Sequence, residues 1–201
     1  MKITKKIDWE KGQGLVPAIV QNADTLQVLM LGYMNEAALA KTQDTGLVSF
    51  HSRSRGTLWT KGETSGNTLS LVSLTVDCDA DTILVKARPK GPTCHEGTVS
   101  CFGNVGASGV GFLGYLDALI RDRKAADPSS SYTAKLLQGP LVKAAQKVGE
   151  EGVETALAAV AETDAEFKGE AADLIYHLLV LLAAKDMPFE DVIEVLQDRH
   201  K

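Results

Sequence analysis

The stretch Gly103-Asn104-Val105-Gly106-Ala107-Ser108-Gly109-Val110-Gly111-Phe112-Leu113-Gly114 separates two parts of the chain that differ in their hydrophobic period. Its closely spaced glycines disfavour both strands and helices, so it is the natural link between two domains. We therefore predict one domain over residues 1–108 and a second over residues 109–201, a division that a chain of 201 residues can accommodate.

The part before this link alternates short apolar runs with residues typical of turns. Runs of this kind predict β-strands, and they lie at residues 26–31, 47–51, 69–76 and 83–87. One helix is predicted over residues 35–42, because Asn35 is a favourable N-cap and the residues after it favour helix. The first domain is therefore predicted to be mainly β.

The part after the link has its apolar residues at helical spacing. Helices are predicted around residues 113–120 and over residues 132–137, 140–160, 165–185 and 188–199. The second domain is therefore predicted to be an all-α helical bundle. The whole chain is predicted to be a two-domain α+β protein.

The charge and composition exclude several classes of protein. The net charge of −5 divides into +1 for residues 1–108 and −6 for residues 109–201, so neither part has the basic excess of a nucleic-acid binder. The longest apolar run, residues 174–184, contains His177 and is too short to span a membrane. The lysines near the N-terminus are not followed by an apolar segment, which argues against a secretory signal. We expect a cytoplasmic protein.

Three aspartates alternate with other residues in Asp77-Cys78-Asp79-Ala80-Asp81, directly after a predicted strand. If this segment is extended, the three carboxylates share one face and Cys78 points to the other. Carboxylates suit a hard cation such as Mg²⁺, whereas a thiolate suits Zn²⁺. A calcium-binding helix-loop-helix motif is excluded, because it needs glycine and glutamate where this chain has Thr82 and Arg88.

The three cysteines of the chain, Cys78, Cys94 and Cys101, all lie in the first domain. Their odd number and wide spacing suit neither a secreted disulfide framework nor the paired spacing of a structural zinc site. Three protein ligands would leave the fourth position of a tetrahedral zinc open for water, which is the arrangement of a catalytic site. The alternative is three buried free thiols. His95 is either a proton carrier beside such a site or a solvated loop residue.

Two polar segments, residues 51–55 and 59–67, are rich in glycines, hydroxyl groups and cationic side chains. Such groups can hold a phosphate, and the candidate cations are Arg53, Arg55 and Lys61. The alternative is a pair of turns that carry solvated charges.

Five segments of the first domain resemble the phosphoribosyl-AMP cyclohydrolase family and occur in the order of that family. They are Met30-Leu31-Gly32-Tyr33-Met34-Asn35, Ser52-Arg53-Ser54-Arg55, Trp59-Thr60-Lys61-Gly62-Glu63-Thr64-Ser65-Gly66-Asn67, the aspartate-rich segment 77–81, and Gly91-Pro92-Thr93-Cys94-His95-Glu96-Gly97 with Ser100-Cys101-Phe102. The resemblance extends over about residues 9–103, and five motifs in order make it specific.

This resemblance implies an obligate homodimer in which one subunit contributes Cys78 to a zinc ion and the other contributes Cys94 and Cys101. It also implies Mg²⁺ at Asp77, Asp79 and Asp81. The reaction of the family is hydrolytic opening of the purine ring of phosphoribosyl-AMP between N1 and C6. In that reaction His95 is a candidate proton carrier, and the candidates for binding the phosphates are Arg53, Arg55 and Lys61.

In the second domain, one face of the predicted helix 140–160 is charged. At 100° per residue, a single arc of about 100° contains Lys143, Lys147, Glu150, Glu151 and Glu154. A solvated outer face would give the same pattern, so this helix alone does not distinguish the two interpretations.

The next predicted helix, residues 165–185, is apolar over nearly its whole circumference and carries a narrow polar stripe of Glu170, Asp173 and His177. We expect this helix to be buried, and a buried carboxylate costs roughly several kcal/mol unless it is paired or bound to a metal. A magnesium ion between this stripe and the glutamates of the preceding helix would remove that cost. A helix–helix contact balanced by lysines is the alternative.

The acidic residues of both helices resemble the pattern of all-α nucleotide pyrophosphohydrolases. More narrowly, three segments resemble phosphoribosyl-ATP pyrophosphohydrolase over about residues 112–200: Tyr132-Thr133-Ala134-Lys135-Leu136, Lys147-Val148-Gly149-Glu150-Glu151 and Asp173-Leu174-Ile175-Tyr176-His177. The resemblance implies cleavage of the α–β phosphoanhydride with Mg²⁺ held by Glu150, Glu151, Glu154, Glu170 and Asp173. Glu150 and Glu151 are also catalytic candidates, and Lys143 and Lys147 are candidates for binding the leaving pyrophosphate. Gly152 replaces the alanine usual in the family, which puts the stability of this helix in question.

Both resemblances in one chain, in this order, imply a bifunctional hydrolase of histidine biosynthesis that acts on small phosphoribosyl nucleotides. The second domain would remove pyrophosphate from phosphoribosyl-ATP, and the first would then open the ring of phosphoribosyl-AMP. Two alternatives remain open. One is a nucleoside triphosphate pyrophosphohydrolase with an accessory metal domain, and the other is a first domain that serves as a structural zinc module for a protein partner.

Overall fold

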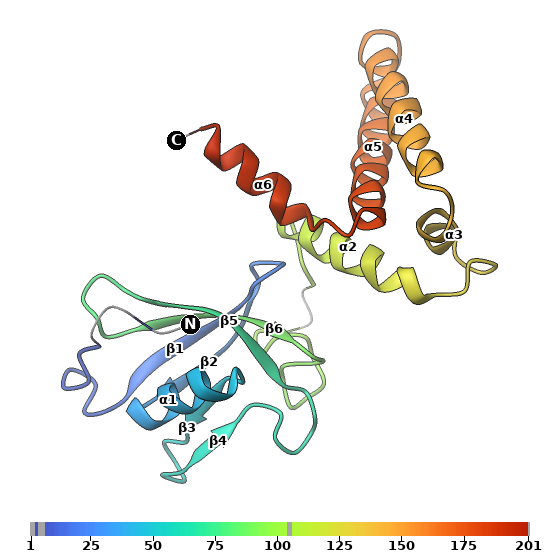
Figure 1. Cartoon of the computed structure of the whole chain (residues 1–201). Coiled ribbons are helices and arrows are strands. Elements are labelled where there is room, and N and C mark those ends of the chain that lie inside the picture. The colour runs from blue at the N-terminus through green and yellow to red at the C-terminus, as the bar shows by residue number, and fades with distance from the viewer. Residues whose placement is uncertain (1–2, 4–6, 104–105, 201) are drawn as a thin grey trace. The chain divides into compact units, whose positions relative to one another are not determined.

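The computed structural model describes residues 3, 7–103 and 106–200 of the chain, so residues 104 and 105 of the predicted link lie outside the described part. The chain divides into two compact units, Met1–Phe112, which is rich in strands, and Leu113–Lys201, which is helical (Figure 1). The predicted α+β class, with a mainly-β part followed by an all-α part, is confirmed. None of the described helices combines the length and the apolarity that a membrane span requires.

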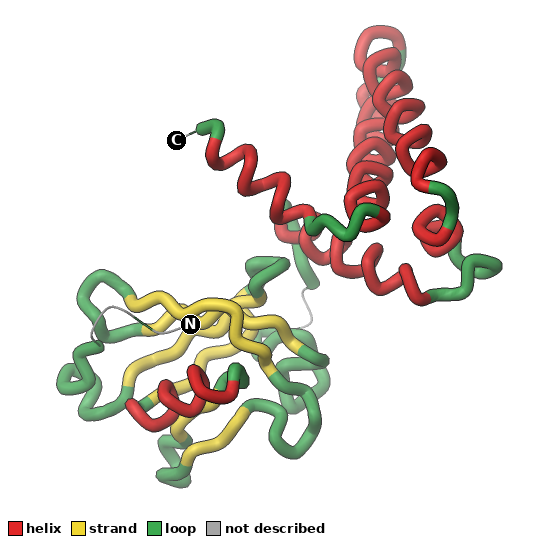
Figure 2. Tube along the Cα trace, in the orientation of Figure 1, coloured by secondary structure: helices red, strands yellow, loops and turns green. Residues whose placement is uncertain are grey.

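The strand-rich unit contains a four-stranded sheet with the strand order β2-β1-β6-β5. Its strands are β1 (Val16–Asn22), β2 (Val28–Met34), β5 (Leu69–Val76) and β6 (Ile83–Pro89). β1 pairs antiparallel with β2 and parallel with β6, and β5 pairs antiparallel with β6. Two strands that are far apart in the sequence, β1 and β6, therefore form the centre of the sheet (Figure 2).

β1 is a strand that the sequence analysis did not predict, although its residues alternate regularly between buried and half-buried positions. Pro17 interrupts the run and lacks the N–H group that pairing on both sides needs. The structure accommodates it because the pairing of β1 with β6 starts one residue later, at Ala18 opposite Ile83. Pro17 is thus paired on one side only, opposite Tyr33 of β2.

A smaller sheet and one helix complete this unit. β3 (Ser49–His51) pairs antiparallel with β4 (Leu58–Thr60), a short strand that the turn-rich sequence around it concealed. The helix α1 (Glu36–Thr45) begins at Asn35, whose side chain accepts a hydrogen bond of 2.8 Å from the Ala38 N–H group, as an N-cap does. The helix ends at Gly46, whose φ of 69° is left-handed backbone that glycine adopts without strain.

Gly32 of β2 leaves room for Phe50, a fully buried side chain in the core of this unit. A Cβ atom at Gly32 would lie 2.4 Å from Cδ1 and 2.5 Å from Cε1 of Phe50, closer than carbon atoms pack. The ring has little room to move, because it packs against Trp59 with the ring centroids 5.1 Å apart. We expect Gly32→Ala to lower the free energy of unfolding by about 1–3 kcal/mol, which chemical denaturation would measure.

The exposed Gly169 of the helical unit offers a matched control for this prediction. An added Cβ atom there meets nothing within 4 Å, so Gly169→Ala should leave the stability unchanged or raise it. Unchanged stability of the Gly32→Ala variant would show that the strand and the Phe50 ring relax more easily than their packing indicates.

The helices of the second unit lie within a few residues of their predicted positions. They are α2 (Gly111–Asp122), the 3₁₀ helix η1 (Arg123–Ala125), α3 (Tyr132–Gln138), α4 (Leu141–Ala161), α5 (Asp164–Ala184) and α6 (Phe189–Asp198). α4 and α5 pack along each other as a hairpin (Figure 1). The start of α5 is fixed by a capping box, in which Thr163 and Glu166 each accept a hydrogen bond from the backbone of the other.

The core of the helical unit lies at the C-terminal half of α5. Leu179 and Val180 of this half are fully buried and pack with Ile120 and Leu137. The expectation that α5 is buried throughout is wrong for its first half, where Asp173 is exposed and Ile175 is 40% exposed. The physical reason is that α4 and α3 cover only part of the circumference of a helix that is apolar nearly all round.

Candidate functional site

The three aspartates of residues 77–81 converge in a turn after β5. One ligand oxygen from each of Asp77, Asp79 and Asp81 lies within 4.8 Å of the others. The expected extended conformation is wrong, because Asp77 Oδ1 accepts hydrogen bonds from the N–H groups of Asp81 (3.0 Å) and Thr82 (3.1 Å). Ala80 adopts a left-handed φ of 68° within the same turn. The turn, and not strand alternation, brings the carboxylates together.

Two further side chains lie at this aspartate group. Cys78 is exposed, with its Sγ atom 3.9 Å from Asp79 Oδ1. Lys11, which the sequence analysis did not single out, donates a hydrogen bond of 2.9 Å to Asp79 Oδ2. No local sequence pattern reveals this contact, because 68 residues separate the two partners.

Cys94 and Cys101 are brought together by a short turn of residues 94–98. The Cys94 N–H group donates to the Thr98 carbonyl (3.0 Å), and the Gly97 N–H group donates to the Cys94 carbonyl (3.1 Å). The Cys101 N–H group donates to the Leu29 carbonyl (2.8 Å), which anchors this residue at β2. The two thiols lie close enough for each to affect the pKa of the other. Among the described residues, the only groups of three or more close metal-ligand atoms consist of carboxylates. The three cysteines of one copy of the chain therefore do not form a common site, because Cys78 lies apart from the other two.

The environments of the two neighbouring thiols shift their pKa values in opposite directions. Hydrogen bonds from the Glu96 backbone and then from the Thr98 side chain lower the pKa of Cys94. Partial desolvation of its thiol raises the pKa of Cys101, although the residue as a whole is exposed, and the adjacent Cys94 raises it further. Cys94 is therefore the more readily deprotonated of the pair, and the thiolate is the form that binds zinc. His95 is exposed beside it, with Nδ1 3.8 Å from Cys94 Sγ.

The cations predicted to bind phosphate lie next to β3 and β4. The guanidinium carbon of the exposed Arg53 lies 3.9 Å from the centroid of the Tyr33 ring. Lys61 Nζ donates a hydrogen bond of 3.3 Å to the Asn67 carbonyl. The charge of Lys61 opposes the rise in the pKa of Cys101, so this lysine lies within electrostatic reach of the cysteine pair. Arg55 is exposed.

A second carboxylate group forms where α4 and α5 face each other. Ligand oxygens of Glu151 and Glu154 from α4 and of Glu170 from α5 lie within 4.8 Å of one another. Residues three apart on a helix share a face, which explains why the two α4 glutamates point to the same place. Burial raises the pKa of Glu170, and the charges of Glu154 and Glu151 raise it further. A divalent cation would remove this repulsion.

Glu151 is the buried member of the second carboxylate group, with its side chain 6% exposed. Lys147 Nζ lies 2.9 Å from Glu151 Oε1 and 3.0 Å from Glu150 Oε2, so one lysine serves two glutamates. His177 Nε2 lies 3.6 Å from the same Oε1 atom of Glu151. His177 Nδ1 is buried and has no hydrogen-bond partner among the described residues. His177 belongs to the predicted polar stripe of α5, but the sequence predicted no role for it.

The other predicted residues of the helical unit lie around this group. Glu150 is held by Lys147 and accepts a 2.7 Å hydrogen bond from the side-chain amide of Gln146. Lys143 Nζ donates to the carbonyl oxygen of the same amide (3.2 Å). Asp173 is exposed, and its charge contributes to the raised pKa of Glu170. The participation of Glu150 and Asp173 as metal ligands stays a prediction.

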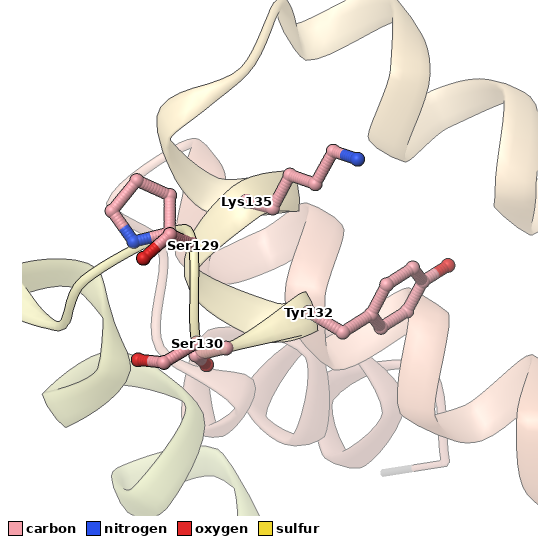
Figure 3. A pocket seen from close by; sticks show the side chains of 6 residues that line it. Ser129, Ser130, Tyr132 and Lys135 are labelled. Atoms are coloured by element: carbon pink, nitrogen blue, oxygen red, sulfur yellow. The ribbon is translucent and has the colours of Figure 1, made fainter.

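An open hollow lies beside the start of α3 and is lined by Pro128, Ser129, Ser130, Ser131, Tyr132 and Lys135. Figure 3 shows Tyr132 and Lys135 projecting from the helix, with Ser129 and Ser130 in the loop before it. Tyr132 contacts His177 edge-on, with the ring centroids 6.1 Å apart. The hollow is therefore connected to the second carboxylate group through His177. The Ser129 hydroxyl donates to Asp127 (2.7 Å), so a negative charge lies in the loop that forms its wall.

Comparison with known proteins assigns both units. Residues 30–103 match the phosphoribosyl-AMP cyclohydrolase family, and residues 113–200 match the phosphoribosyl-ATP pyrophosphohydrolase family. The chain is 57% identical over 195 residues to the histidine biosynthesis bifunctional protein HisIE of Xanthomonas campestris pv. campestris, covering 97% of this chain and 93% of that protein. The protein of the same name from Salmonella typhimurium is 56% identical over 197 residues, covering 98% of this chain and 97% of that protein.

Proposed function

Since this chain belongs to the family of bifunctional histidine-biosynthesis proteins that join a phosphoribosyl-AMP cyclohydrolase to a phosphoribosyl-ATP pyrophosphohydrolase, we propose a metal-dependent chemistry for each of its units. The chain is a bifunctional hydrolase, with the cyclohydrolase in the strand-rich unit and the pyrophosphohydrolase in the helical unit. The pyrophosphohydrolase converts phosphoribosyl-ATP into phosphoribosyl-AMP, on which the cyclohydrolase then acts. The observation that carries the proposed metal dependence is the convergence of three carboxylates in each unit.

In the helical unit, Glu151, Glu154 and Glu170 would hold Mg²⁺, with Glu150 and Asp173 completing the ligand set. Carboxylate oxygens are the hard ligands that Mg²⁺ prefers, and Lys147 supplies a single positive charge to this group of three glutamates. When bound, Mg²⁺ supplies the charge that stabilises the phosphates during cleavage of the phosphoanhydride. Glu150 and Glu151 are the candidates for orienting the attacking water and accepting its proton.

Two lysines on the same helix are proposed to bind the leaving pyrophosphate. Lys147 is bound to two glutamates and would exchange one of them for a phosphate oxygen. Lys143 is exposed one turn closer to the start of α4, where its contact to a neutral amide leaves its charge available to an anion. In this arrangement the substrate would lie along α4, with its reacting phosphates at the carboxylate group and its pyrophosphate towards the start of the helix.

In the strand-rich unit, Cys94 and Cys101 would bind Zn²⁺ together with Cys78 from a second copy of the chain. The adjacent thiols of Cys94 and Cys101 and the separate position of Cys78 support this division. When bound with an open position, Zn²⁺ lowers the pKa of its water to about 7. His95 would move a proton between the water and the purine ring, because its imidazole is exposed next to Cys94. The aspartate group Asp77, Asp79 and Asp81 would hold Mg²⁺.

Arg53, Arg55 and Lys61 are proposed to bind the phosphate of phosphoribosyl-AMP. The flat face of the Arg53 guanidinium packs on the Tyr33 ring. Its N–H groups lie at the edge of the guanidinium plane, so this packing does not prevent them from donating hydrogen bonds to a phosphate. Lys61 lies within electrostatic reach of the cysteine pair. A phosphate bound to Lys61 would therefore lie near the proposed zinc site. The substrates are small phosphoribosyl nucleotides, and no nucleic acid or membrane is required.

The shared zinc implies a homodimer through the strand-rich unit, and exposed apolar residues of the helical unit support a further contact between copies. On α4, Val153 is 60% exposed, Leu157 is 57% exposed and Val160 is 83% exposed. Apolar side chains that gather at a surface are typical of a contact with another protein, here a second copy. We place this dimer in the cytoplasm, where cysteines stay reduced and available to zinc.

The decisive assay supplies the purified chain with phosphoribosyl-ATP, Mg²⁺ and Zn²⁺. We expect pyrophosphate release followed by the absorbance change of ring opening, and loss of both signals after divalent cations are removed. Readdition of Mg²⁺ alone to the stripped protein should restore pyrophosphate release first. Full turnover after exhaustive chelation would reject the metal dependence.

The same assay separates this function from a general nucleoside triphosphate pyrophosphohydrolase. Deoxynucleoside triphosphates replace phosphoribosyl-ATP in a parallel reaction, and kcat/KM is compared. A preference for the deoxynucleotides would favour the alternative, whereas preference for phosphoribosyl-ATP supports the proposal.

A further inference from the structure

The ammonium group of Lys11 forms ion pairs with the aspartate group of the strand-rich unit. Lys11 Nζ is 2.9 Å from Asp79 Oδ2 and 3.6 Å from Asp81 Oδ2. It also donates a hydrogen bond of 3.1 Å to the backbone carbonyl of Asp79. One ammonium group therefore contacts two of the three carboxylates proposed to bind Mg²⁺.

The backbone around Lys11 is fixed on the same turn. The Asp8 N–H group donates a hydrogen bond of 2.7 Å to the Ala80 carbonyl, and Ile7 is buried in the core of the unit. Asp8 Oδ1 accepts hydrogen bonds from the N–H groups of Glu10 (3.1 Å) and Lys11 (3.3 Å). The base of the lysine side chain is thus held beside the aspartates by contacts that do not involve its charge.

The ammonium group itself is not buried. The Lys11 side chain is 42% exposed, and those of Asp79 and Asp81 are 58% and 35% exposed. A side chain with a fixed base and a solvated end can leave the carboxylates without unfolding anything. A divalent cation and this ammonium group cannot both occupy the position between Asp79 and Asp81, because like charges repel.

We infer that Lys11 is a tethered counter-ion of the aspartate group: it neutralises Asp79 and Asp81 before a divalent cation arrives, and it must be displaced when the cation binds. Lys11 therefore competes with divalent cations for Asp79 and Asp81 and weakens the affinity of the group for them. This inference rests on the proposed function, in which the aspartate group holds Mg²⁺.

The test measures binding of Mn²⁺, used alone as a spectroscopic substitute for Mg²⁺, to the zinc-loaded full-length chain by electron paramagnetic resonance. All variants carry Glu154→Gln and Glu170→Gln, so that the carboxylate group of the helical unit is not counted. The additional substitution Lys11→Met keeps the length of the side chain and removes its charge. We expect Lys11→Met to tighten Mn²⁺ binding roughly two- to fivefold, the range for loss of an exposed ion pair.

Two matched variants separate competition from other effects. Lys90→Met removes one positive charge from an exposed residue elsewhere in the unit and should leave the affinity unchanged. Lys11→Arg keeps a competing cation and should leave Mn²⁺ binding close to that of the parent. A purely structural role of Lys11 predicts the opposite sign, because a disordered turn would bind Mn²⁺ more weakly after Lys11→Met.

The outcomes distinguish failure of this inference from failure of the proposed function. Adding Asp79→Asn and Asp81→Asn to the parent, which carries Glu154→Gln and Glu170→Gln, should abolish its binding of Mn²⁺. This result would assign the bound Mn²⁺ to the aspartate group. If no Mn²⁺ signal depends on these aspartates, the proposed cation site is rejected and the role of Lys11 with it. If that signal is present and Lys11→Met leaves the affinity unchanged or weaker, only the counter-ion role is rejected.

Discussion

Replacing Cys94 by serine should reduce ring opening of phosphoribosyl-AMP by more than about 100-fold while pyrophosphate release from phosphoribosyl-ATP continues at its original rate. Cys94 is the buried member of the adjacent thiol pair, and the environment of its thiol favours the thiolate. A serine hydroxyl is a poor zinc ligand at neutral pH. Loss of a mere supporting partner of a metal ligand costs about 10- to 100-fold, so loss of the ligand itself should cost more.

Both activities and the zinc content would be measured on the same preparation of the Cys94→Ser variant. Val99→Ala is the matched control, because Val99 lies close to the same turn with its side chain 42% exposed and offers no metal ligand. This control should retain zinc and both activities. A Cys94→Ser enzyme that opens the ring at the original rate would rule out the proposed role of Cys94.

The second large effect is expected in the other unit, from Glu154→Gln. Glu154 is exposed and contributes to the carboxylate group of α4 and α5, so its replacement should impair chemistry without impairing the fold. We expect kcat for pyrophosphate release to fall on the order of 10²- to 10³-fold, comparable to the loss of one preorganised electrostatic contact to a transition state. Ring opening of phosphoribosyl-AMP supplied directly should not change.

Glu162→Gln provides the control for Glu154→Gln. Glu162 is an exposed glutamate directly after α4 that lies outside the carboxylate group, and its replacement removes the same charge. Magnesium titrations of both variants would show whether the loss in Glu154→Gln is accompanied by a weaker dependence on Mg²⁺. Equal rates for the two variants would exclude Glu154 from the site.

Periodicity predicted the two long helices well because each carries enough turns for its pattern to emerge. The predicted residues 140–160 and 165–185 became α4 and α5 with shifts of one residue at each end. β1 was not predicted because Pro17 breaks the pattern of a strand. Whether a strand tolerates this proline depends on where its pairing with β6 begins. That information lies in β6, which is distant in the sequence, and no local pattern contains it.

The candidate sites show the same division between local and distant information. Glu151, Glu154 and Glu170 were predicted from helix geometry and resemblance, and the structure brings their oxygens together. The turn of the aspartate segment was not predicted, because Asp77 accepts hydrogen bonds from its own neighbours and overrides the strand alternation. Lys11 was missed because its approach to Asp79 depends on how the whole unit folds.

The family, the fold class and the two enzymatic activities predicted from the sequence are confirmed by the matches over both units and over nearly the full chain. The resemblance succeeded where local physics alone left alternatives open, because several motifs in a fixed order are far more specific than any one of them. The identities of the metal ions, the shared zinc and the homodimer stay predictions.

The parallel pairing of β1 with β6 has a consequence during synthesis on the ribosome. β1 ends at Asn22, and its neighbour β6 begins at Ile83, so the first strand emerges long before the second exists. At about 5–20 residues translated per second, several seconds pass before the middle of the sheet can close. During that interval β1 can pair only with β2. Its other edge exposes unpaired backbone groups, to which a chaperone can bind or through which two nascent chains can aggregate.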